Sequence, residues 1–362
     1  MQKFLFLIFI LFTIVFSAQT NSDSQIVIEK KTRKWDTIKY QKFERALIVG
    51  LYQQYRTFNI DFEQTINRDT LNLSTHTYST EIDFSGAGGI VINYDKFQLS
   101  ISQGISPPST VGGKGHTNVF GLGLSVGDNR WVSETYFKRF KGFYNSTTPN
   151  FDSSNFNQTK QYYLQPSMVT SLFMTRFMRF RNHEKYSYKA GFGCNYRQLK
   201  SAASFIWGGS FSVFDLKNDS AIIPQKARYL YNDYSNMKGI RSVNLSANIG
   251  IAATIVIFKA WFIGGYFTIG PEQQWRNYNL TTSNRTISYI GWSGTGRVSF
   301  GLNMKRFYMI WAIARDYNVY NSTKVSATTS SYTANTTFGW RFKNKTPKFY
   351  EKFMKTKIYS YL

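Results

Sequence analysis

The sequence predicts an all-β protein: a transmembrane, antiparallel, up-and-down β-barrel of about 14 strands, with about 12 as the alternative. Apolar and polar residues alternate with a period of two over several long stretches, which is the pattern of strands with one apolar face. A tilted strand of about ten residues is long enough to cross a bilayer. Phe, Tyr and Trp make up 18% of the chain, which fits the aromatic girdles of such barrels. Beyond the N-terminus, no apolar run is long enough for a spanning helix.

The N-terminal segment has the features of a secretory signal peptide. Lys3 provides a positive charge, residues 4–16 are apolar, and Ser17 and Ala18 are small residues suited to cleavage. The apolar run is too short to anchor the chain in a bilayer. We therefore expect a signal peptide at residues 1–18, a polar periplasmic lead-in at residues 19–44, and localisation in the outer membrane after export.

A long alternation lies in residues 186–213. Its first part has an apolar stripe at every second position: Tyr186, Tyr188, Ala190, Phe192, Cys194 and Tyr196. We expect a wall strand whose stripe faces lipid, and we expect the single cysteine to be a small wall residue without a disulfide partner. A β-sandwich shows the same alternation, but its strands usually have about five to six residues.

The barrel is expected to occupy residues 45–342. Further apolar stripes lie within residues 82–94, 97–101, 120–126, 243–257, 261–269, 290–302, 307–313 and 332–342. Tight turns near residues 95, 128, 182–185, 258–260 and 305 alternate with longer polar connections at 103–116, 141–160, 271–286 and 318–330. Short turns on the periplasmic side and long loops outside are typical of these barrels. Thirteen crossings are recognisable, and both chain ends in the periplasm require an even number, so we expect another strand within residues 218–234.

Three segments carry a resemblance to a known family: KYSYKAGFGCNYRQLKSAASFIWGG at residues 185–209, GGKGHTNVFGL at 112–122 and RWVSETYFKRFKGFY at 130–144. Over residues 36–342 the chain resembles an uncharacterised outer-membrane β-barrel family of Bacteroidetes-type bacteria, domain of unknown function 4421. Members commonly have Gly-Lys-Gly-Lys-Thr where residues 113–117 are GKGHT, and Ser-Ala-Gly-Ser where residues 201–204 are SAAS. The resemblance implies the barrel and leaves its function open.

The polar face of each strand is expected to line the lumen. Its charged and polar candidates are Asp83, Glu134, Lys189, Asn195, Arg197, Arg297, Asp316 and Arg341. Basic groups outnumber acidic ones in this set, and a basic pore lining favours anions. The leading interpretation is a passive porin-like channel with weak anion preference. In the alternative, the charges pair inside a closed barrel that is structural or binds a periplasmic or surface partner, with residues 143–160 or 218–234 plugging the lumen.

The sequence offers little for catalysis or cofactors. Its three histidines are predicted on opposite sides of the membrane, His76 and His116 in outer loops and His183 in a periplasmic turn. A third interpretation is a lipid-modifying enzyme with His116 at the outer rim. The leading expectation is that the protein is not an enzyme. No acidic or histidine cluster has metal-ligand spacing, and residues 112–115 lack the spacing of a phosphate-binding loop. We expect no metal and no cofactor.

The expected partners follow from position and charge. Outer-membrane lipid and lipopolysaccharide would surround the barrel, and nucleic acid is not expected. The aromatic end of the last strand, Phe338, Trp340 and Phe342, resembles the signal that barrel-assembly machinery recognises. The chain has a formal net charge of +24, and its tail at residues 343–362 is strongly basic. This tail is interpreted either as a solvated periplasmic extension or as a contact for an acidic periplasmic partner.

Overall fold

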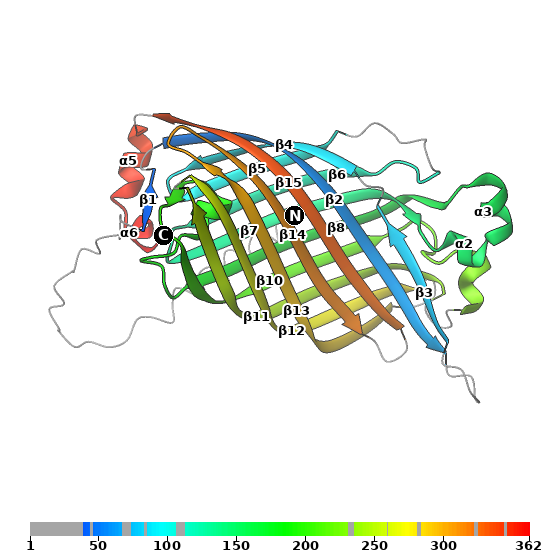
Figure 1. Ribbon diagram of the computed structural model, residues 1–362. Coiled ribbons are helices and arrows are strands. Elements are labelled where there is room, and N and C mark those ends of the chain that lie inside the picture. Colours follow the sequence, from blue (N-terminus) through cyan, green and yellow to red (C-terminus); the bar gives the residue numbers. More distant parts are fainter. Residues whose placement is uncertain are drawn as a thin grey trace, which may run out of the picture. The chain divides into compact units, whose positions relative to one another are not determined.

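The computed structural model describes residues 39–43, 46–66, 74–82, 85–105, 113–230, 235–258, 260–280, 284–321, 325–343 and 346–362. The expected signal peptide and Asp83 lie outside these residues. The described chain forms a closed antiparallel β-barrel (Figure 1). The fold class predicted from period-two alternation is thus confirmed.

Thirteen strands form the wall, in the order β15-β14-β13-β12-β11-β10-β8-β7-β3-β2-β4-β5-β6, with β15 also paired to β2 and β7 to β6. Their bounds are β2 (Ala46–Ile66), β3 (Ser74–Glu81), β4 (Ser85–Tyr94), β5 (Phe97–Gly104), β6 (Asn118–Gly127), β7 (Trp131–Asn145), β8 (Tyr163–Phe180), β10 (Ala202–Lys217), β11 (Met237–Ile257), β12 (Trp261–Leu280), β13 (Asn284–Asn303), β14 (Phe307–Asn321) and β15 (Val325–Lys343).

Two of the thirteen strands, β3 and β4, belong to one crossing. Both pair with β2, β3 along its second half and β4 along its first half. The described strands therefore make twelve crossings, the alternative number in the prediction. The described part of residues 218–234, where another strand was expected, contains instead the 3-10 helix η1 (Gln225–Leu230). Its neighbours β10 and β11 pair directly along their whole length, which leaves no gap in the wall for a further strand.

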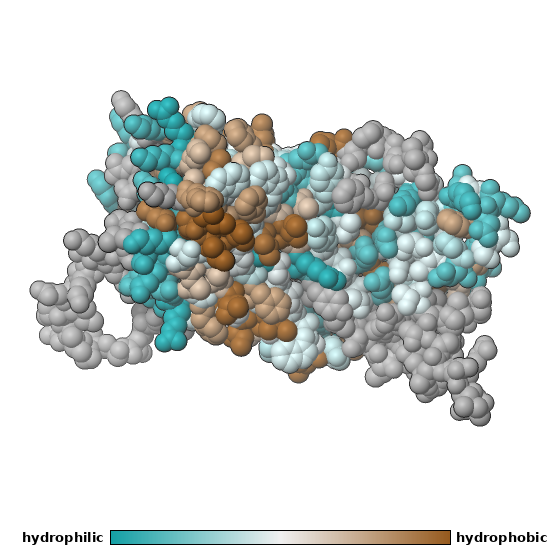
Figure 2. All heavy atoms as spheres, viewed as in Figure 1, coloured by the Kyte–Doolittle hydropathy of each residue, from teal (hydrophilic) through white to brown (hydrophobic). Residues whose placement is uncertain are grey.

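The outer face carries an apolar belt on the half of the barrel nearest the short turns (Figure 2). On β11, Leu245, Ile249, Ile251 and Ile255 are all more than half exposed, whereas Ser246, Ala252 and Thr254 between them are buried. An apolar side chain at such exposure is stable only against lipid or another apolar surface. The belt is therefore the segment suited to a bilayer.

The other half of the barrel continues beyond the belt. Strands β12 and β13 have 20 residues each, about twice what a bilayer crossing needs. The long connections predicted at residues 271–286 and 318–330 are consequently wrong, because β12 extends to Leu280 and β14 to Asn321. Their residues are polar and lack an apolar stripe, yet the antiparallel ladder continues through them, since backbone hydrogen bonds do not require apolar side chains.

Residues 186–196, which were expected to form a wall strand, lie inside the barrel instead. Strands β8 and β10 pair directly, with Phe180 opposite Ile206, so the connection between them leaves the wall. It forms the helix α4 (Tyr188–Phe192) and the strand β9 (Tyr196–Gln198), and β9 pairs with β1 (Tyr40–Lys42). We call residues 181–201 together with β1 the plug.

Burial on both faces explains why the alternation of residues 186–196 was misleading. Tyr186, Tyr188 and Tyr196 on the predicted lipid face are at most 2% exposed, and so are Lys189 and Asn195 on the other face. The tyrosines Tyr186 and Tyr188 pack against wall side chains from β7, β8, β10, β11 and β12. Ser187 begins the helix, because its hydroxyl accepts a hydrogen bond from the Ala190 amide. Cys194, predicted to be a wall residue, is also buried in the plug.

The two ends of the barrel carry different segments (Figure 1). At the end with the short turns, here the turn end, lie the plug and the helices α5 (Lys348–Met354) and α6 (Lys357–Tyr361). At the other end, the loop end, lie α2 (Thr148–Phe151) and α3 (Ser153–Thr159). The tail is therefore folded, rather than an extension in solvent. Part of the expected lead-in, Tyr40–Lys42, is a plug strand.

Candidate functional site

The described side chains cross the lumen at three levels. At the turn end the plug fills it. In the middle lies a network of charged and polar groups, and at the loop end lies an apolar core. The strands β2 and β10 are far apart in the sheet order, yet Phe58 and Phe214 place their rings 6.2 Å apart in this core. The described residues therefore do not form an open, water-filled pore through the middle of the barrel.

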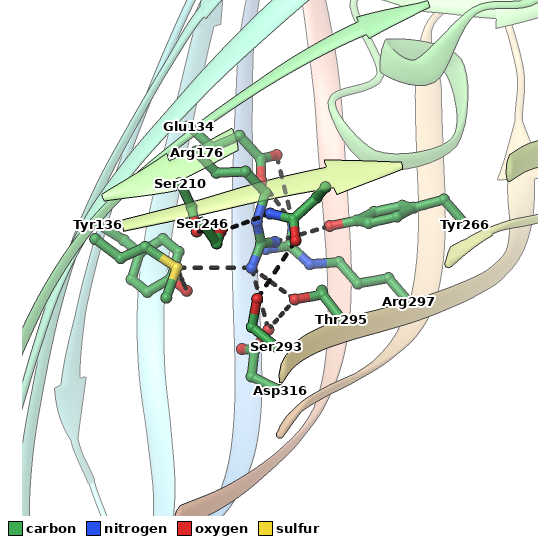
Figure 3. A network of polar contacts seen from close by, with 12 residues as sticks. Glu134, Tyr136, Arg176, Ser210, Ser246, Tyr266, Ser293, Thr295, Arg297 and Asp316 are labelled. Carbon is green, nitrogen blue, oxygen red and sulfur yellow. Dashed lines mark hydrogen bonds and ion pairs between the residues drawn. The ribbon is translucent and has the colours of Figure 1, made fainter. Parts of the chain in front are cut away.

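The central network joins opposite walls through ion pairs (Figure 3). Arg176 on β8 lies 3.4 Å from Asp316 on β14, and Arg297 on β13 lies 3.1 Å from Glu134 on β7. Arg176 also donates hydrogen bonds to Tyr266, at 3.1 Å, and to Thr295, at 2.8 Å. Charge-assisted hydrogen bonds are the strong ones inside a protein. The network therefore joins five wall strands, β7, β8, β12, β13 and β14, across the lumen.

The plug is attached to this network and to the turns. Tyr188 donates a hydrogen bond of 2.7 Å to Glu134. Lys189 donates to the carbonyl oxygens of Lys96, at 2.9 Å, and Gly127, at 2.6 Å. Burial lowers the pKa of the Lys189 ammonium to about 7, and the nearby carboxylates of Asp128 and Asp95 offset part of this effect. The plug helix is thus held by side-chain contacts, since none of its backbone pairs with a wall strand in the described sheet.

Wall side chains also hold the plug from the opposite side. Arg341 on β15 donates to the carbonyl of Cys194, at 2.9 Å from Nη2, and to Asn303, at 2.7 Å. Asn303 in turn donates to the carbonyls of Ala190 and Tyr196, at 3.1 and 3.0 Å. Burial raises the pKa of the Cys194 thiol to about 12, which keeps it protonated and unreactive.

The turn residue Asp95 connects the plug with both termini of the described chain. Its carboxylate forms a 2.8 Å ion pair with Lys42 of β1 and accepts hydrogen bonds from Tyr350, at 3.0 Å, and from Tyr359. Its carbonyl accepts a hydrogen bond of 2.8 Å from Asn195. Burial raises the pKa of Asp95, but Lys42 and the two tyrosines outweigh this effect and hold it below its ordinary value.

A cavity of about 240 Å³ remains beside the central network. One side of it is lined by small side chains of β14 and β15, among them Ala312, Ala314 and Thr333. Its described lining contains four cations and two carboxylates: Arg56, Lys138, Lys189, Arg297, Glu134 and Asp316. A second cavity of about 20 Å³ shares Lys138 and Asp316 with it and reaches Phe58 of the loop-end core.

The predicted lumen residues have the following places. Glu134, Arg297 and Asp316 meet in the central network, and Asp316 lies 3.9 Å from Lys138 as well. Lys189, Asn195 and Arg197 belong to the plug, so they do not line a wall, as was expected for a strand. Arg341 is a buried wall residue that binds the plug. Asp83 lies outside the described residues.

Several residues that complete the site were missed by sequence reasoning. Arg176 lies in β8, where Met174 and Met178 on the same inner parity interrupt the polar stripe. Arg56 and Lys138 were not among the predicted lumen residues, although they lie in the long strands β2 and β7. A charged residue within a long alternating stretch is the signal that could have identified them.

The described residues contain no group of three His, Cys, Asp or Glu side chains placed to hold a metal ion. His116 is exposed in the connection before β6, whereas His183 lies at the turn end, where its carbonyl accepts a hydrogen bond from Tyr40. No helix in the described residues is both long and apolar enough to cross a membrane.

The chain was compared with curated proteins and with solved structures. No curated protein matches the sequence. Similar solved structures include the outer membrane protease OmpT from Escherichia coli (5% identity, TM-score 0.41, 83% of this chain and 98% of that chain). Others are the translocator domain of the autotransporter NalP from Neisseria meningitidis (9%, 0.39, 81% and 88%) and the COG4313 outer membrane channel from Pseudomonas putida F1 (10%, 0.33, 83% and 96%).

The family is established by the sequence. Residues 34–342 match the family described as Domain of unknown function (DUF4421), which is most of the chain and the whole described wall. The resemblance inferred from three short segments is confirmed by this match. The chain therefore belongs to the DUF4421 family.

Proposed function

We propose that this protein is an outer-membrane channel for small anions that is closed in the described conformation and opens when the plug moves. The observation that carries the proposal is the basic cavity between the central network and the small-residue side of β14 and β15. Buried charges are costly, and a barrel that served only as a support would be at least as stable with an apolar interior. Charges of one prevailing sign along a lumen select ions.

Outer-membrane placement is supported by the apolar belt and by the expected export signal. Exposed apolar side chains lie on strands around the barrel, for example Leu99 on β5, Phe177 on β8 and Phe300 on β13. With this belt in the bilayer, the plug would lie near the periplasmic side and the loop-end half would extend from the cell surface. The expected passive channel becomes a gated one in this proposal, since the described side chains cross the lumen at three levels.

Planar-bilayer conductance tests the proposal. The decisive variant replaces residues 184–200 with a short Asn-Gly turn, which β8 and β10 can accept because they already pair up to Phe180 and Ile206. We expect the unaltered protein to conduct weakly, and the variant to conduct at least tenfold more, with a reversal potential that favours anions. A matched control shortens the loop-end connection at residues 147–160, where conductance should stay low.

The proposal is contradicted if the folded, plug-free barrel does not conduct ions, or if it conducts cations in preference to anions. Silence would favour the second candidate, a non-conducting barrel that binds a partner at the turn end. A specific observation supports it: α5 and α6 expose Phe349, Ile358 and Tyr361 by more than half, next to exposed lysines. Such a surface suits an acidic periplasmic partner.

A further inference from the structure

We propose that the lumen contains a binding site for a small oxyanion, a carboxylate or phosphate group, at Arg56 and Lys138. This inference deepens the proposed channel by naming the place where its solute pauses. The site is distinct from the central ion-pair network, because its main cation takes no part in that network.

Arg56 is a buried cation without an acidic partner among the described residues. Its side chain projects from β2 into the lumen and is 5% exposed. One nitrogen, Nη2, lies 3.5 Å from the Ser102 hydroxyl, while Nε and Nη1 have no hydrogen-bond partner in the described structure. Leaving buried donors unsatisfied costs stability, more so when the group is charged. An anion in the adjoining cavity would satisfy them.

The backbone around Arg56 is shaped to hold the guanidinium in this place. Its side chain reaches over β5 toward Gly121 on β6, where a Cβ atom would lie only 3.1 Å from Nη2. In the sheet register Gly121 lies opposite Lys138 of β7. The absence of a side chain at Gly121 thus gives Arg56 room beside the inner face of β7, where the second cation originates.

Lys138 is only partly neutralised. Its ammonium lies 3.9 Å from Asp316, and Arg176 shares the same carboxylate at 3.4 Å. Two cations therefore compete for one carboxylate, while Arg56 has none. Both Arg56 and Lys138 line the cavity of about 240 Å³. Gln54, two residues before Arg56 on the same face of β2, also lines it and has an unpartnered buried oxygen that could accept a hydrogen bond from a ligand hydroxyl or water.

The size of the cavity limits the ligand. A cavity of about 240 Å³ holds several water-sized groups, so an inorganic phosphate or a small dicarboxylate fits it. Arginine and lysine are the residues that recognise such oxyanions.

Isothermal titration of the full-length barrel in detergent tests the site, with inorganic phosphate in one arm and succinate in the other. We expect the unaltered protein to bind at least one probe. Arg56→Gln should weaken binding at least tenfold, which corresponds to about 1.4 kcal/mol. The matched control Arg315→Gln removes the same charge from the exposed face of β14, next to Asp316, and should bind as the unaltered protein does.

Lys138→Gln provides an independent variant on another strand, in which binding should also weaken, and heat-modifiable migration on a gel verifies that each variant is folded. Binding of phosphate alone indicates a phosphate-bearing solute and binding of succinate alone a carboxylate. Full binding by both Arg56→Gln and Lys138→Gln, or no binding of either probe by the unaltered protein, overturns the proposal. The experiment is independent of conductance: a silent barrel that binds phosphate through Arg56 refutes the channel and keeps the site.

Discussion

The two ends of the lumen are filled by different means. At the loop end, wall residues such as Phe58 on β2, Phe140 on β7 and Phe214 on β10 pack against one another, and Ile222 from the connection after β10 joins them. At the turn end, a separate segment enters the lumen and is held by hydrogen bonds from side chains to carbonyl groups. The loop-end core belongs to the wall, whereas the plug is an addition to it.

This difference indicates where the barrel can open. Removing the loop-end core would remove apolar burial that stabilises the strands themselves. Moving the plug would break specific hydrogen bonds and the apolar contacts of Tyr186 and Tyr188, while every wall ladder stays paired. We therefore expect mutations at the loop end to change stability and mutations at the turn end to change conductance.

The largest effect on stability is expected from Phe214→Ala. Phe214 is 4% exposed and its ring lies between those of the loop-end core. Truncating a buried phenylalanine usually costs about 3–5 kcal/mol, because it removes apolar contacts and leaves a cavity. Urea unfolding in detergent or lipid vesicles measures the change. Conductance should remain low, and a large rise in conductance without loss of stability would reverse the assignment of the two ends.

The position of the membrane relative to both ends can be tested with Ile251→Arg. Ile251 is 67% exposed in the middle of the belt, and an arginine there should cost about 2–4 kcal/mol in a bilayer. The matched change Leu164→Arg alters a 44% exposed residue at the loop-end start of β8, outside the belt, and should cost less than about 1 kcal/mol. Folding into vesicles at increasing urea compares the two. Equal costs would mean that the belt is not the bilayer segment.

If residues 186–196 formed a wall strand, Asn195→Arg would be a harmless change in the lumen lining. In the plug we expect the same change to be harmful. Asn195 is 2% exposed and donates to the Asp95 carbonyl. A longer charged side chain has no space there, so this change should destabilise the plug.

The burial of Asn195 in the plug shows what the alternation of polar and apolar residues can and cannot predict. On β11 the stripe from Val243 to Ile257 correctly indicated which side chains face outward, because one face of the strand meets an apolar environment and the other does not. In residues 186–196 the same pattern arises although both faces are buried. A period of two reports a difference in polarity between faces, and only the pairing of β8 with β10 shows that the segment has left the wall.

The candidate site was predictable to a lesser degree, for a related reason. Glu134, Arg297 and Asp316 were identified from parity, since their strands alternate clearly. Their partners are more than a hundred residues away in the chain, as Arg297 and Glu134 illustrate. These distant contacts determine which cations are neutralised by a carboxylate. Arg56 is a cation that is not neutralised in this way. Sequence parity places a charge in the lumen but does not predict its partner.

Arg341→Met should release the plug from β15 with a smaller energetic effect. The change removes the donors to the Cys194 carbonyl and to Asn303, and hydrogen bonds from a charged group contribute about 1.5–3 kcal/mol. We expect faster hydrogen exchange in the plug and more frequent channel openings, with little change in the urea midpoint of the wall. Arg315→Met, on the exposed face of β14, is the control and should change neither. If Arg341→Met unfolds the whole barrel, the plug and the wall are one cooperative unit.

The smallest effect concerns pH at the turn end. Asp95 has a lowered pKa in the folded protein, because Lys42, Tyr350 and Tyr359 outweigh its burial. A carboxylate with a lowered pKa stabilises the folded state above its ordinary pKa of about 4, and this contribution is lost as the pH falls below that value. Acid should therefore loosen α5, α6 and β1 from the turn at Asp95 before the wall unfolds. Proteolysis of the tail between about pH 6 and 3, with an acid-stable protease, measures this release.

In Asp95→Asn the tail should already be accessible at neutral pH and its cleavage should vary little with acid. A tail that is released at the same pH in both proteins would assign the effect to another carboxylate and leave Asp95 as a purely structural turn residue.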